Sequence, residues 1–441
     1  MENKFESQQY SFQNSFGNLR LVAPNMVGGF LQQNTVISIH KSYYVYNEKT
    51  GLWTKFEDEE VKKEIFELLS EEEKQAWTPT VKNNVMELLS VMTKRFNNIP
   101  EQKGNWFCLN NCVVNLDTGK AKKFSSNFFF TGKTTYDFVR GAKCPRFEEY
   151  LDTVSCGNES IKQTLVEVLG YSLSATTKAQ VAFYLFGLGC NGKSIFTDIV
   201  NELVGMHFCV SFKPDELEKS FTRAGLEGKR VLLMPDLDKK DSEHFMTAEM
   251  KKIIAGDLLS AEIKYGGTFN FHSKVKVIVS SNFLPSFLHD NTFGARRRLL
   301  VIPFRKQISE DEKDTGLISE LKGELSGIFL LALEGYKRLK ANKFKFSYKG
   351  EDLIEEIKEG QKQTYPISSF VSECVETKPS SFVRYRVLGK AFAEWCKKNN
   401  VESSIPDSRE LFANIKEQHS KVESKKRGGH RGVLGISLKN Q

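Results

Sequence analysis

Residues Gly187 to Ser194 read G-L-G-C-N-G-K-S and fit the pattern G-x-x-x-x-G-K-[ST] at every fixed position. In such a loop the glycines let backbone N–H groups turn toward a phosphate, and the following helix adds the positive end of its dipole. We expect Lys193 to reach the β- and γ-phosphates and the Ser194 hydroxyl to ligate Mg²⁺. The spacing therefore predicts an ATP site rather than a merely glycine-rich turn. The residues predicted to bind nucleotide are Gly187, Gly189, Asn191, Gly192, Lys193 and Ser194.

Two acids, Asp236 and Asp238, follow the apolar run 231–234. A phosphate loop needs an acidic residue on a neighbouring strand to hold the metal and position the attacking water. A D-x-D pair after a strand is also compatible with a two-metal polymerase or nuclease site, or with plain surface acids. Beside a phosphate loop, the Mg²⁺ and water role is the simplest, and we predict Asp236 as the metal-facing acid. The division of catalytic roles between Asp236 and Asp238 stays open.

Two further polar features come at the ends of apolar strands. Strand 275–279 runs into Ser280, Ser281 and Asn282, and an asparagine there can position water or sense the γ-phosphate. Asparagine at a strand end is also common in turns. Three arginines at 296–298 precede the next apolar strand, where they form a solvated patch, a nucleic-acid contact or an arginine finger. We predict Asn282, Arg297 and Arg298 as catalytic residues.

The elements that must position these residues alternate in type. A strand at 183–186 precedes the loop and a helix follows it, and alternation from 181 to about 304 predicts an α/β core. Upstream, 43–56 reads as two aromatic strands around a turn at Gly51, and 59–69 has the apolar spacing of a helix. Segment 308–360 is amphipathic and helical.

Length and charge set the organisation that we expect. A chain of 441 residues is long enough for two or three domains that each bury a core. We expect an N-terminal α+β region at 1–140, an ATPase core with flanking helices at 141–345, and a linker with a DNA-binding domain at 346–441. The formal net charge of +8 permits a nucleic-acid partner without requiring one.

Composition argues against several other classes. The first ten residues contain no apolar segment of the secretory type, and the apolar runs fall short of the roughly 20 residues of a membrane span. We therefore expect a cytoplasmic protein with no membrane contact. The eight cysteines are scattered, and the one close pair, Cys108 and Cys112, has no further ligands at zinc spacing. We predict free thiols.

The compact order of phosphate loop, acidic strand, asparagine strand and arginines resembles the superfamily 3 helicases, and within them the phage, plasmid and poxvirus primase-helicases. G-x-G-x-N-G-K-S is the favoured form of the loop in that group. The resemblance implies an AAA+ core and a homo-oligomeric ring, a hexamer, whose arginines complete the neighbouring subunit's site. It also implies a DNA-contacting hairpin in which Lys264 binds phosphate of single-stranded DNA in the central channel. Tyr265 either stacks on a base or packs beneath the hairpin.

The C-terminal segment carries a second resemblance. Residues 387–415 are similar to the winged-helix tail of these helicases. A strongly basic stretch follows, which we interpret as a wing that lies on duplex DNA; a solvated basic turn is the alternative. The residues predicted to contact duplex phosphates are Lys425, Lys426, Arg427 and Arg431.

Two features depart from the family pattern. Only about 40 residues precede the strand at Tyr43, without a separate pair of metal-binding acids, so we expect no primase activity. The family's acidic strand commonly ends in Glu, whereas this chain has Asp236. We expect an ATP-driven, ring-forming DNA helicase with 3′ to 5′ polarity that acts in replication of a phage, plasmid or other mobile element. The alternative is a DNA-binding initiator that uses ATP as an assembly switch and unwinds little; a small-molecule kinase would explain neither the arginines nor the hairpin.

Overall fold

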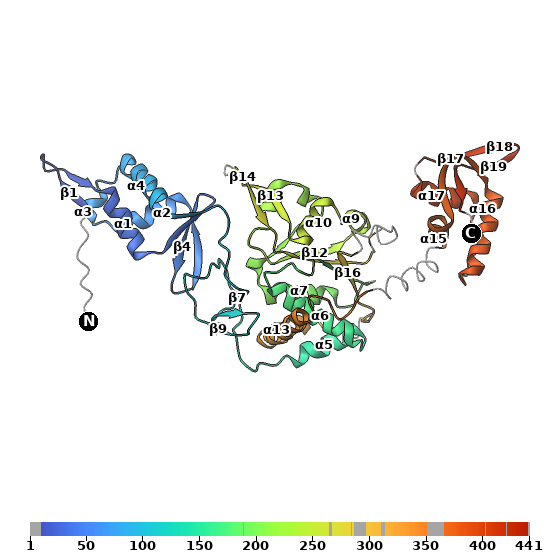
Figure 1. The fold of residues 1–441 in the computed structure, drawn as a ribbon, viewed down its shortest axis with the longest axis horizontal. Helices are drawn as coiled ribbons and strands as arrows, with labels where there is room; N and C mark the ends of the chain where they lie inside the picture. The colour runs from blue at the N-terminus through green and yellow to red at the C-terminus, as the bar shows by residue number, and fades with distance from the viewer. Residues whose placement is uncertain are drawn as a thin grey trace. The chain divides into compact units, whose positions relative to one another are not determined.

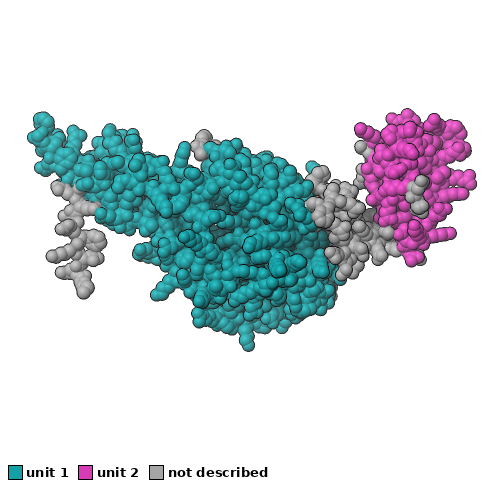
Figure 2. Space-filling view, in the orientation of Figure 1, with its two compact units in different colours: residues 1–349 teal, residues 350–441 magenta. Residues whose placement is uncertain are grey.

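The computed structural model describes residues 10–187, 189–263, 267–283, 285, 297–309, 314–350, 366–401, 403–419 and 421–439. The chain divides into two compact units, residues 1–349 and 350–441, which Figure 2 colours separately. All the residues predicted to bind or hydrolyse nucleotide belong to the first unit. Within the described residues, no helix is both long and apolar enough to cross a membrane.

A parallel sheet forms the centre of the first unit, as the alternating pattern predicts. Its strand order is β11-β12-β15-β10-β16, and every neighbouring pair is parallel. The chain leaves β10 for the far edge of the sheet, steps back to β15, and then places β16 on the other side of β10. Such a reversal opens a crevice at the carboxyl ends of the strands. The strands are β10 (Ala182–Phe186), β11 (Cys209–Ser211), β12 (Val231–Leu237), β15 (Lys276–Ser281) and β16 (Leu299–Pro303).

Helices cover this sheet, which explains why its strands are almost continuously apolar. All six residues of β15 are buried. Helix α7 (Lys193–Val204) packs against β12 and β15, and it gathers with α6 (Glu159–Leu173) and α13 (Leu325–Ala341) on one side (Figure 1). The flanking helices α5 (Pro145–Ser155) and α12 (Leu317–Gly323) pack against this group.

A hairpin projects from the segment between β12 and β15. Strands β13 (Leu258–Ile263) and β14 (Gly267–His272) pair antiparallel, after α10 (Ala248–Ala255), whose first turn Thr247 caps. The hairpin also contacts the N-terminal region, because the Asn98 side-chain amide donates to the Asn270 carbonyl at 3.0 Å. The short elements before it are η1 (Met206–Phe208), η2 (Glu216–Glu218), α8 (Ser220–Ala224) and α9 (Lys239–His244).

The N-terminal region is mixed α and β, and the strands predicted around Gly51 and the helix predicted at 59–69 are both present. Its larger sheet has the order β5-β4-β3-β6, and a three-stranded sheet, β7-β8-β9, follows it along the chain. The strands are β1 (Ser11–Gln13), β2 (Leu19–Leu21), β3 (Val36–Ile39), β4 (Ser42–Asn47), β5 (Leu52–Phe56), β6 (Lys94–Phe96), β7 (Trp106–Cys108), β8 (Val113–Asn115) and β9 (Ala121–Lys122). The helices are α1 (Ala23–Gln33), α2 (Asp58–Glu67), α3 (Glu71–Lys74) and α4 (Pro79–Met92).

The second unit has its own core, centred on Phe370, Phe392 and Trp395. The Trp395 indole N–H donates to Glu373 at 2.8 Å, so the large buried ring leaves no orphaned donor. Its sheet has the order β17-β19-β18. The elements are α15 (Pro366–Cys374), β17 (Val375–Arg384), α16 (Tyr385–Lys398), α17 (Ser408–Gln418), β18 (Glu423–Arg427) and β19 (His430–Leu438). The helices predicted within 308–360 correspond to α12 and α13, and 351–365 lies outside the described residues.

Candidate nucleotide site

The glycine-rich loop leaves the carboxyl end of β10 and leads directly into α7. Gly192 has a φ of 87°, and a Cβ there would lie 2.8 Å from a methyl carbon of Val154. At Gly187 a Cβ would lie 2.0 Å from the side-chain nitrogen of Asn191. The Asn191 amide donates to the Phe304 carbonyl at 3.2 Å, just beyond β16. Glycine is thus required at both positions, and the loop is tied to the neighbouring strand.

Lys193 is the first residue of α7, directly after the loop, and only 5% of its surface is exposed. Its ammonium donates to the Gly187 carbonyl at 2.7 Å, to Asn191 Oδ1 at 3.0 Å and to Asn282 Oδ1 at 3.1 Å. Burial lowers the pKa of Lys193, and the charge of Asp236 acts in the opposite direction. All three acceptors are neutral, so they satisfy hydrogen bonds without neutralising the cation. An ammonium held in this way can bind a phosphate group.

Asp236 lies in an irregular part of β12. Met234 pairs with Val279 and Leu237 pairs with Ser281, so β12 contains one residue more than β15 over the same interval. Asp236 takes a left-handed conformation, with a φ of 51°, and its N–H donates to the Ser280 hydroxyl at 3.1 Å. A bulge of this kind re-aims a side chain at the end of a strand. Asp236 is exposed, and together with Ser194 in the first turn of α7 it offers the oxygen ligands that Mg²⁺ prefers.

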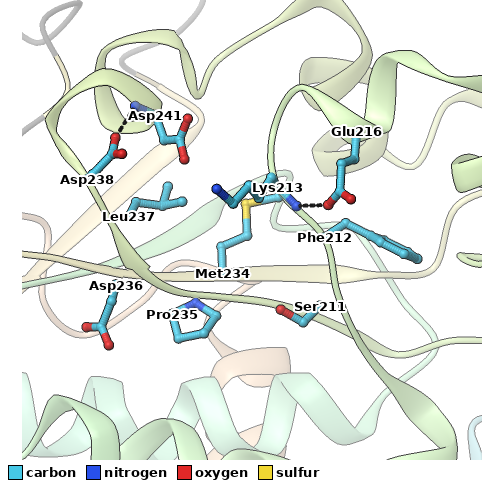
Figure 3. Close-up of a pocket in the computed structure, with 10 residues that line it drawn as sticks. All are labelled: Ser211, Phe212, Lys213, Glu216, Met234, Pro235, Asp236, Leu237, Asp238 and Asp241. Atoms are coloured by element: carbon cyan, nitrogen blue, oxygen red, sulfur yellow. Dashed lines mark hydrogen bonds between the residues drawn. The ribbon is translucent and has the colours of Figure 1, made fainter.

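Asp238 has a different local role. Its carboxylate accepts a hydrogen bond from the Asp241 N–H at 2.8 Å and caps the N-terminus of α9. In Figure 3 the carboxylates of Asp238 and Asp241 lie on one side of the β12 ribbon and that of Asp236 lies on the other. A cavity of about 240 Å³ lies here, and its lining includes Ser211, Lys213, Asp236 and Asp238. The bulge therefore separates two carboxylates that a regular strand would place on the same face.

Asn282 follows β15 and meets Lys193 although 89 residues separate them. Buried hydroxyls brace this strand end. The Ser281 hydroxyl donates to the Leu237 carbonyl at 2.7 Å, and the Tyr184 hydroxyl donates to the Phe283 carbonyl at 2.6 Å. These bonds fix the ends of β10, β12 and β15 relative to one another. The sequence did not point to them, because buried Ser and Tyr residues follow no motif.

Tyr150, which was also not predicted, supports the loop through a hydrogen bond to its backbone. The Tyr150 hydroxyl on α5 donates to the Gly192 carbonyl at 2.9 Å. Burial raises the pKa of Tyr150 well above its usual value, so this hydroxyl remains a donor. On the other side, the Ile308 N–H donates to the Cys190 carbonyl at 2.8 Å. Arg305 and Lys306, which were not among the predicted site residues, therefore belong to a segment that runs beside the loop.

The arginines lie where the strands of the sheet begin, whereas the phosphate loop lies where they end. These two sides of the sheet are called here the amino edge and the carboxyl edge. The Ala182 N–H donates to the Arg298 carbonyl at 2.8 Å, which places Arg298 beside the first residue of β10. The loop begins beyond Phe186, the last of the five residues of β10. At about 3.3 Å per residue, the strand between the two edges spans roughly 16 Å. Arg297 is exposed at the same edge, and Arg296 lies outside the described residues.

The predicted DNA contacts fall into two groups. Lys264 and Tyr265 lie outside the described residues, between the ends of β13 and β14. In the second unit, β18 and β19 are joined by Gly428 and Gly429, whose φ values of 56° and 80° fit a two-residue hairpin turn. All the cations predicted to contact duplex DNA are exposed on this hairpin: Lys425, Lys426, Arg427 and Arg431.

One pairing in this hairpin places two cations opposite each other. Lys426 lies directly opposite Arg431. Like charges facing each other across an antiparallel pair cost roughly 0.2–1 kcal/mol, so a nearby anion would relieve this repulsion. Lys425 is partly neutralised, because its ammonium lies 2.5 Å from Glu423.

Two family models match separate parts of the chain. The model described as D5 N terminal like matches residues 30–156. A family of unknown function, DUF5906, matches residues 185–298, which run from the phosphate loop to Arg298. The second match therefore covers every residue predicted to bind or hydrolyse ATP.

Curated relatives match over part of the chain. A protein of Acanthamoeba polyphaga mimivirus, L207/L206, which is provisionally named a helicase, is 25% identical over 163 residues. That alignment covers 36% of this chain and 17% of the viral protein. The uncharacterised mitochondrial protein ymf21 of Marchantia polymorpha is 27% identical over 105 residues, covering 21% of this chain and 58% of the relative.

Solved structures extend the likeness to nearly the whole chain. An apo structure of the NrS-1 C terminal region superposes with a TM-score of 0.53 at 13% identity, covering 93% of this chain and 98% of that one. Another apo structure of the same region gives a TM-score of 0.51 at 14% identity, with the same coverage. At such identity the likeness shows a shared fold.

Proposed function

We propose that this protein is an ATP-hydrolysing DNA helicase of the superfamily 3 type, acting in replication of a phage, plasmid or other mobile element. The observation that carries the proposal is the hydrogen bond between Lys193 and Asn282, made beside Asp236 at the carboxyl edge of the sheet. Three separate sequence features, which no local packing requires to be together, meet at one point. The match to a D5-type region and the distant relation to a viral protein provisionally named a helicase favour a helicase among ATPases.

Two details of the fold support the finer assignment. The strand with the phosphate loop lies between the asparagine strand and the strand that follows the arginines, in the order β11-β12-β15-β10-β16. This is the arrangement expected of an AAA+ core. In the second unit, the order helix, strand, helix, helix, strand, strand with a basic hairpin supports a winged-helix assignment.

The side chains have distinct roles in the proposed reaction. Lys193 binds the phosphates, and its burial strengthens that interaction because little water screens the charge. Ser194 and Asp236 would hold Mg²⁺, which supplies charge neutralisation on the phosphate oxygens. Asp236 also orients the attacking water. Without nucleotide, the Asn282 side-chain oxygen accepts a hydrogen bond from the Lys193 ammonium. Once Lys193 binds the nucleotide, the Asn282 amide can instead form a hydrogen bond with the phosphate or with the attacking water.

The arginines suit a site made by two subunits. Arg297 and Arg298 precede β16, at the edge away from their own phosphate loop. A head-to-tail contact that joins this edge to the carboxyl edge of a second copy is heterologous, and such contacts form a ring when the rotation between copies closes. We propose a hexameric ring with the arginines acting on the neighbour's ATP. The central hairpin would then move along single-stranded DNA with 3′ to 5′ polarity, as the family resemblance implies.

A second candidate function is favoured by the separate basic unit. Its exposed hairpin of like charges can bind duplex DNA without any unwinding. An origin-binding initiator that uses ATP as an assembly switch would need the same parts.

Strand displacement separates the two candidates. The experiment uses a forked duplex with a labelled strand, ATP and Mg²⁺, with Lys193→Ala as the control. ATP-dependent release of the strand that Lys193→Ala lacks supports the helicase. Hydrolysis and duplex binding without release support the initiator. Absence of both hydrolysis and nucleotide binding in the parent protein would overturn the ATPase assignment itself.

A further inference from the structure

One face of the sheet β7-β8-β9 combines an aromatic ring with cations. Trp106 pairs with Asn115, and Cys108 pairs with Val113, which in turn pairs with Lys122. Residues directly opposite one another, and residues two apart on a strand, share a face of the sheet. Trp106 and Lys122 therefore lie on the same face. Phe107 lies on the other, fully buried against Phe329.

The tryptophan on this face is held in place but partly exposed. Its indole N–H donates to the Lys103 carbonyl at 3.1 Å, and its ring centroid lies 5.0 Å from that of Phe128. The Lys122 ammonium lies 5.1 Å from the Trp106 centroid. A cation and a flat aromatic surface thus occur together. The cation can bind a phosphate, and the aromatic surface can stack on a base.

The surroundings carry a strong excess of positive charge. Residues 102–136 contain five lysines and a single acid, Asp117. That acid is already paired, because the Lys340 ammonium lies 2.7 Å from its carboxylate. Four of the five lysines are exposed: Lys103, Lys120, Lys122 and Lys123. Within the described residues, none of these four forms an ion pair with a carboxylate.

We propose that these four lysines and Trp106, a cluster in which Lys122 shares the sheet face of Trp106 and which is here called the basic face, bind a single-stranded nucleic acid at a site separate from the β13–β14 hairpin and from the second unit. The lysines would contact successive phosphates, and a base would stack against Trp106. A single strand fits better than a duplex, because a paired and stacked base has no free surface to offer an aromatic ring. The choice of DNA as the nucleic acid rests on the proposed helicase function.

The basic face is attached firmly to the ATPase core. The Asn105 side-chain amide donates to the Tyr336 hydroxyl on α13 at 2.9 Å, and that hydroxyl donates to Asp117 at 3.1 Å. These contacts flank the Trp106 strand and the turn before β9. A strand bound to the basic face would be held at a fixed distance from the helices that support the phosphate loop.

Intrinsic fluorescence gives a direct test. The chain has four tryptophans, of which Trp53 and Trp395 are only 4% and 2% exposed. Titration of the full chain with a thymidine oligonucleotide of about 20 nucleotides, at low salt and without ATP, should quench the emission. The quench should be lost in Trp106→Phe while the thermal midpoint is kept. Trp106→Ala should bind about tenfold more weakly, in keeping with typical base stacking energies.

The cations are tested by salt dependence. Lys122→Ala/Lys123→Ala should lower the slope of log affinity against log salt by about 1.4, at roughly 0.7 for each single-strand phosphate contact. The matched control is Lys62→Ala/Lys63→Ala, an adjacent lysine pair on α2, which should leave the slope unchanged. Equal loss of slope in both variants would reduce the effect to net charge and overturn the site.

The outcomes separate this site from the proposed function. A quench that persists in Trp106→Phe, or a duplex that competes as well as the single strand, overturns the basic face as a single-strand site. Basal ATPase should stay unchanged in Lys122→Ala/Lys123→Ala. Trp106-dependent binding in a protein that hydrolyses no ATP would uphold the basic face and refute the helicase instead.

Discussion

Two lysines are buried at opposite edges of the same parallel sheet, and their surroundings differ. Lys193, at the carboxyl edge, is 5% exposed, and Lys276, at the amino end of β15, is 2% exposed. The ammonium of Lys276 donates to the carbonyls of Ser174 and Lys274. Burial lowers the pKa of both lysines. Burial and a lowered pKa are therefore shared by the two sites and do not by themselves identify a nucleotide site.

The charges around each lysine make the difference. Asp236 lies near Lys193 and acts to raise its pKa, whereas Arg230 and Lys274 lower the pKa of Lys276 further. Lys193 also ends a glycine loop beside a crevice, while Lys276 lies against the Tyr171 ring, 5.5 Å from its centroid. The carboxyl edge has acids that can hold a metal beside the cation. The amino edge holds Lys276 among Arg230 and Lys274, and the Lys274 ammonium pairs with Glu101 at 3.1 Å. In the proposed ring, Arg297 and Arg298 at this edge would act on the nucleotide of a second copy.

The largest expected effect tests this division between the edges. Lys193→Ala and Arg297→Ala/Arg298→Ala should each be nearly inactive as ATPases, since a missing arginine finger costs about 10³–10⁵ in rate. If the two edges belong to one site shared between subunits, mixing the two variants restores some intact interfaces. Random equal mixing gives roughly a quarter of them. Hydrolysis by the mixture, measured after subunit exchange, should therefore recover by a similar fraction.

Exchange itself must be shown, for example by energy transfer between labelled subunits. Mixed assemblies that form and remain inactive would contradict the shared site. Activity close to that of the parent protein in the arginine variant alone would remove the arginines from catalysis.

The second effect separates two acids of the carboxyl edge. Asp236→Asn should keep nucleotide binding but lower hydrolysis about 10²–10⁴-fold, because the amide can neither hold Mg²⁺ nor polarise water. Asp238→Asn should change hydrolysis little, because asparagine also caps a helix. Asp238→Ala should lower stability by about 1 kcal/mol through loss of the cap on α9. Hydrolysis rates and chemical unfolding measure the two effects, and a more severe loss of rate in Asp238→Asn would reverse the assignment.

The carboxyl edge was largely predictable from sequence because its chemistry sits at the ends of apolar strands. The phosphate loop and Asn282 each follow a strand, Asp236 lies near the end of one, and parallel strands bring their carboxyl ends to one edge. The bulge that aims Asp236 was not predictable, because it depends on the register between β12 and β15. The support from Tyr150 and Tyr184 depends on packing between segments about 40 to 100 residues apart. The position of Arg298 at the amino edge required the strand order, which no local pattern contains.

A third, smaller effect compares the two lysines through ligand binding. Saturating ATP with Mg²⁺ stabilises a protein by an amount set by ligand concentration, about 2.7 kcal/mol at one hundred times Kd. The parent protein and Lys276→Met should both show this gain in thermal midpoint, and Lys193→Ala should show little of it. Methionine is chosen because it fills a similar buried volume without charge. Loss of the gain in Lys276→Met would mean that the amino edge also acts on its own subunit's nucleotide.

The smallest expected effect is the pH dependence of stability at the amino edge. The folded chain holds Lys276 with a pKa well below 10.5, its usual value, chiefly because of burial. Between the folded and the unfolded pKa, the unfolded chain binds more protons, so the stability of the parent protein rises with pH in that window. The slope for one such group is at most about 1.4 kcal/mol per pH unit. Lys276→Met lacks this gain, so the stability of the variant relative to the parent should fall as pH increases toward 10. Urea unfolding at a series of pH values measures this difference, with Lys63→Met as a control for the loss of one charge. A difference between parent and Lys276→Met that stays constant with pH would show that the buried ammonium at the amino edge keeps its proton as readily as it does in water.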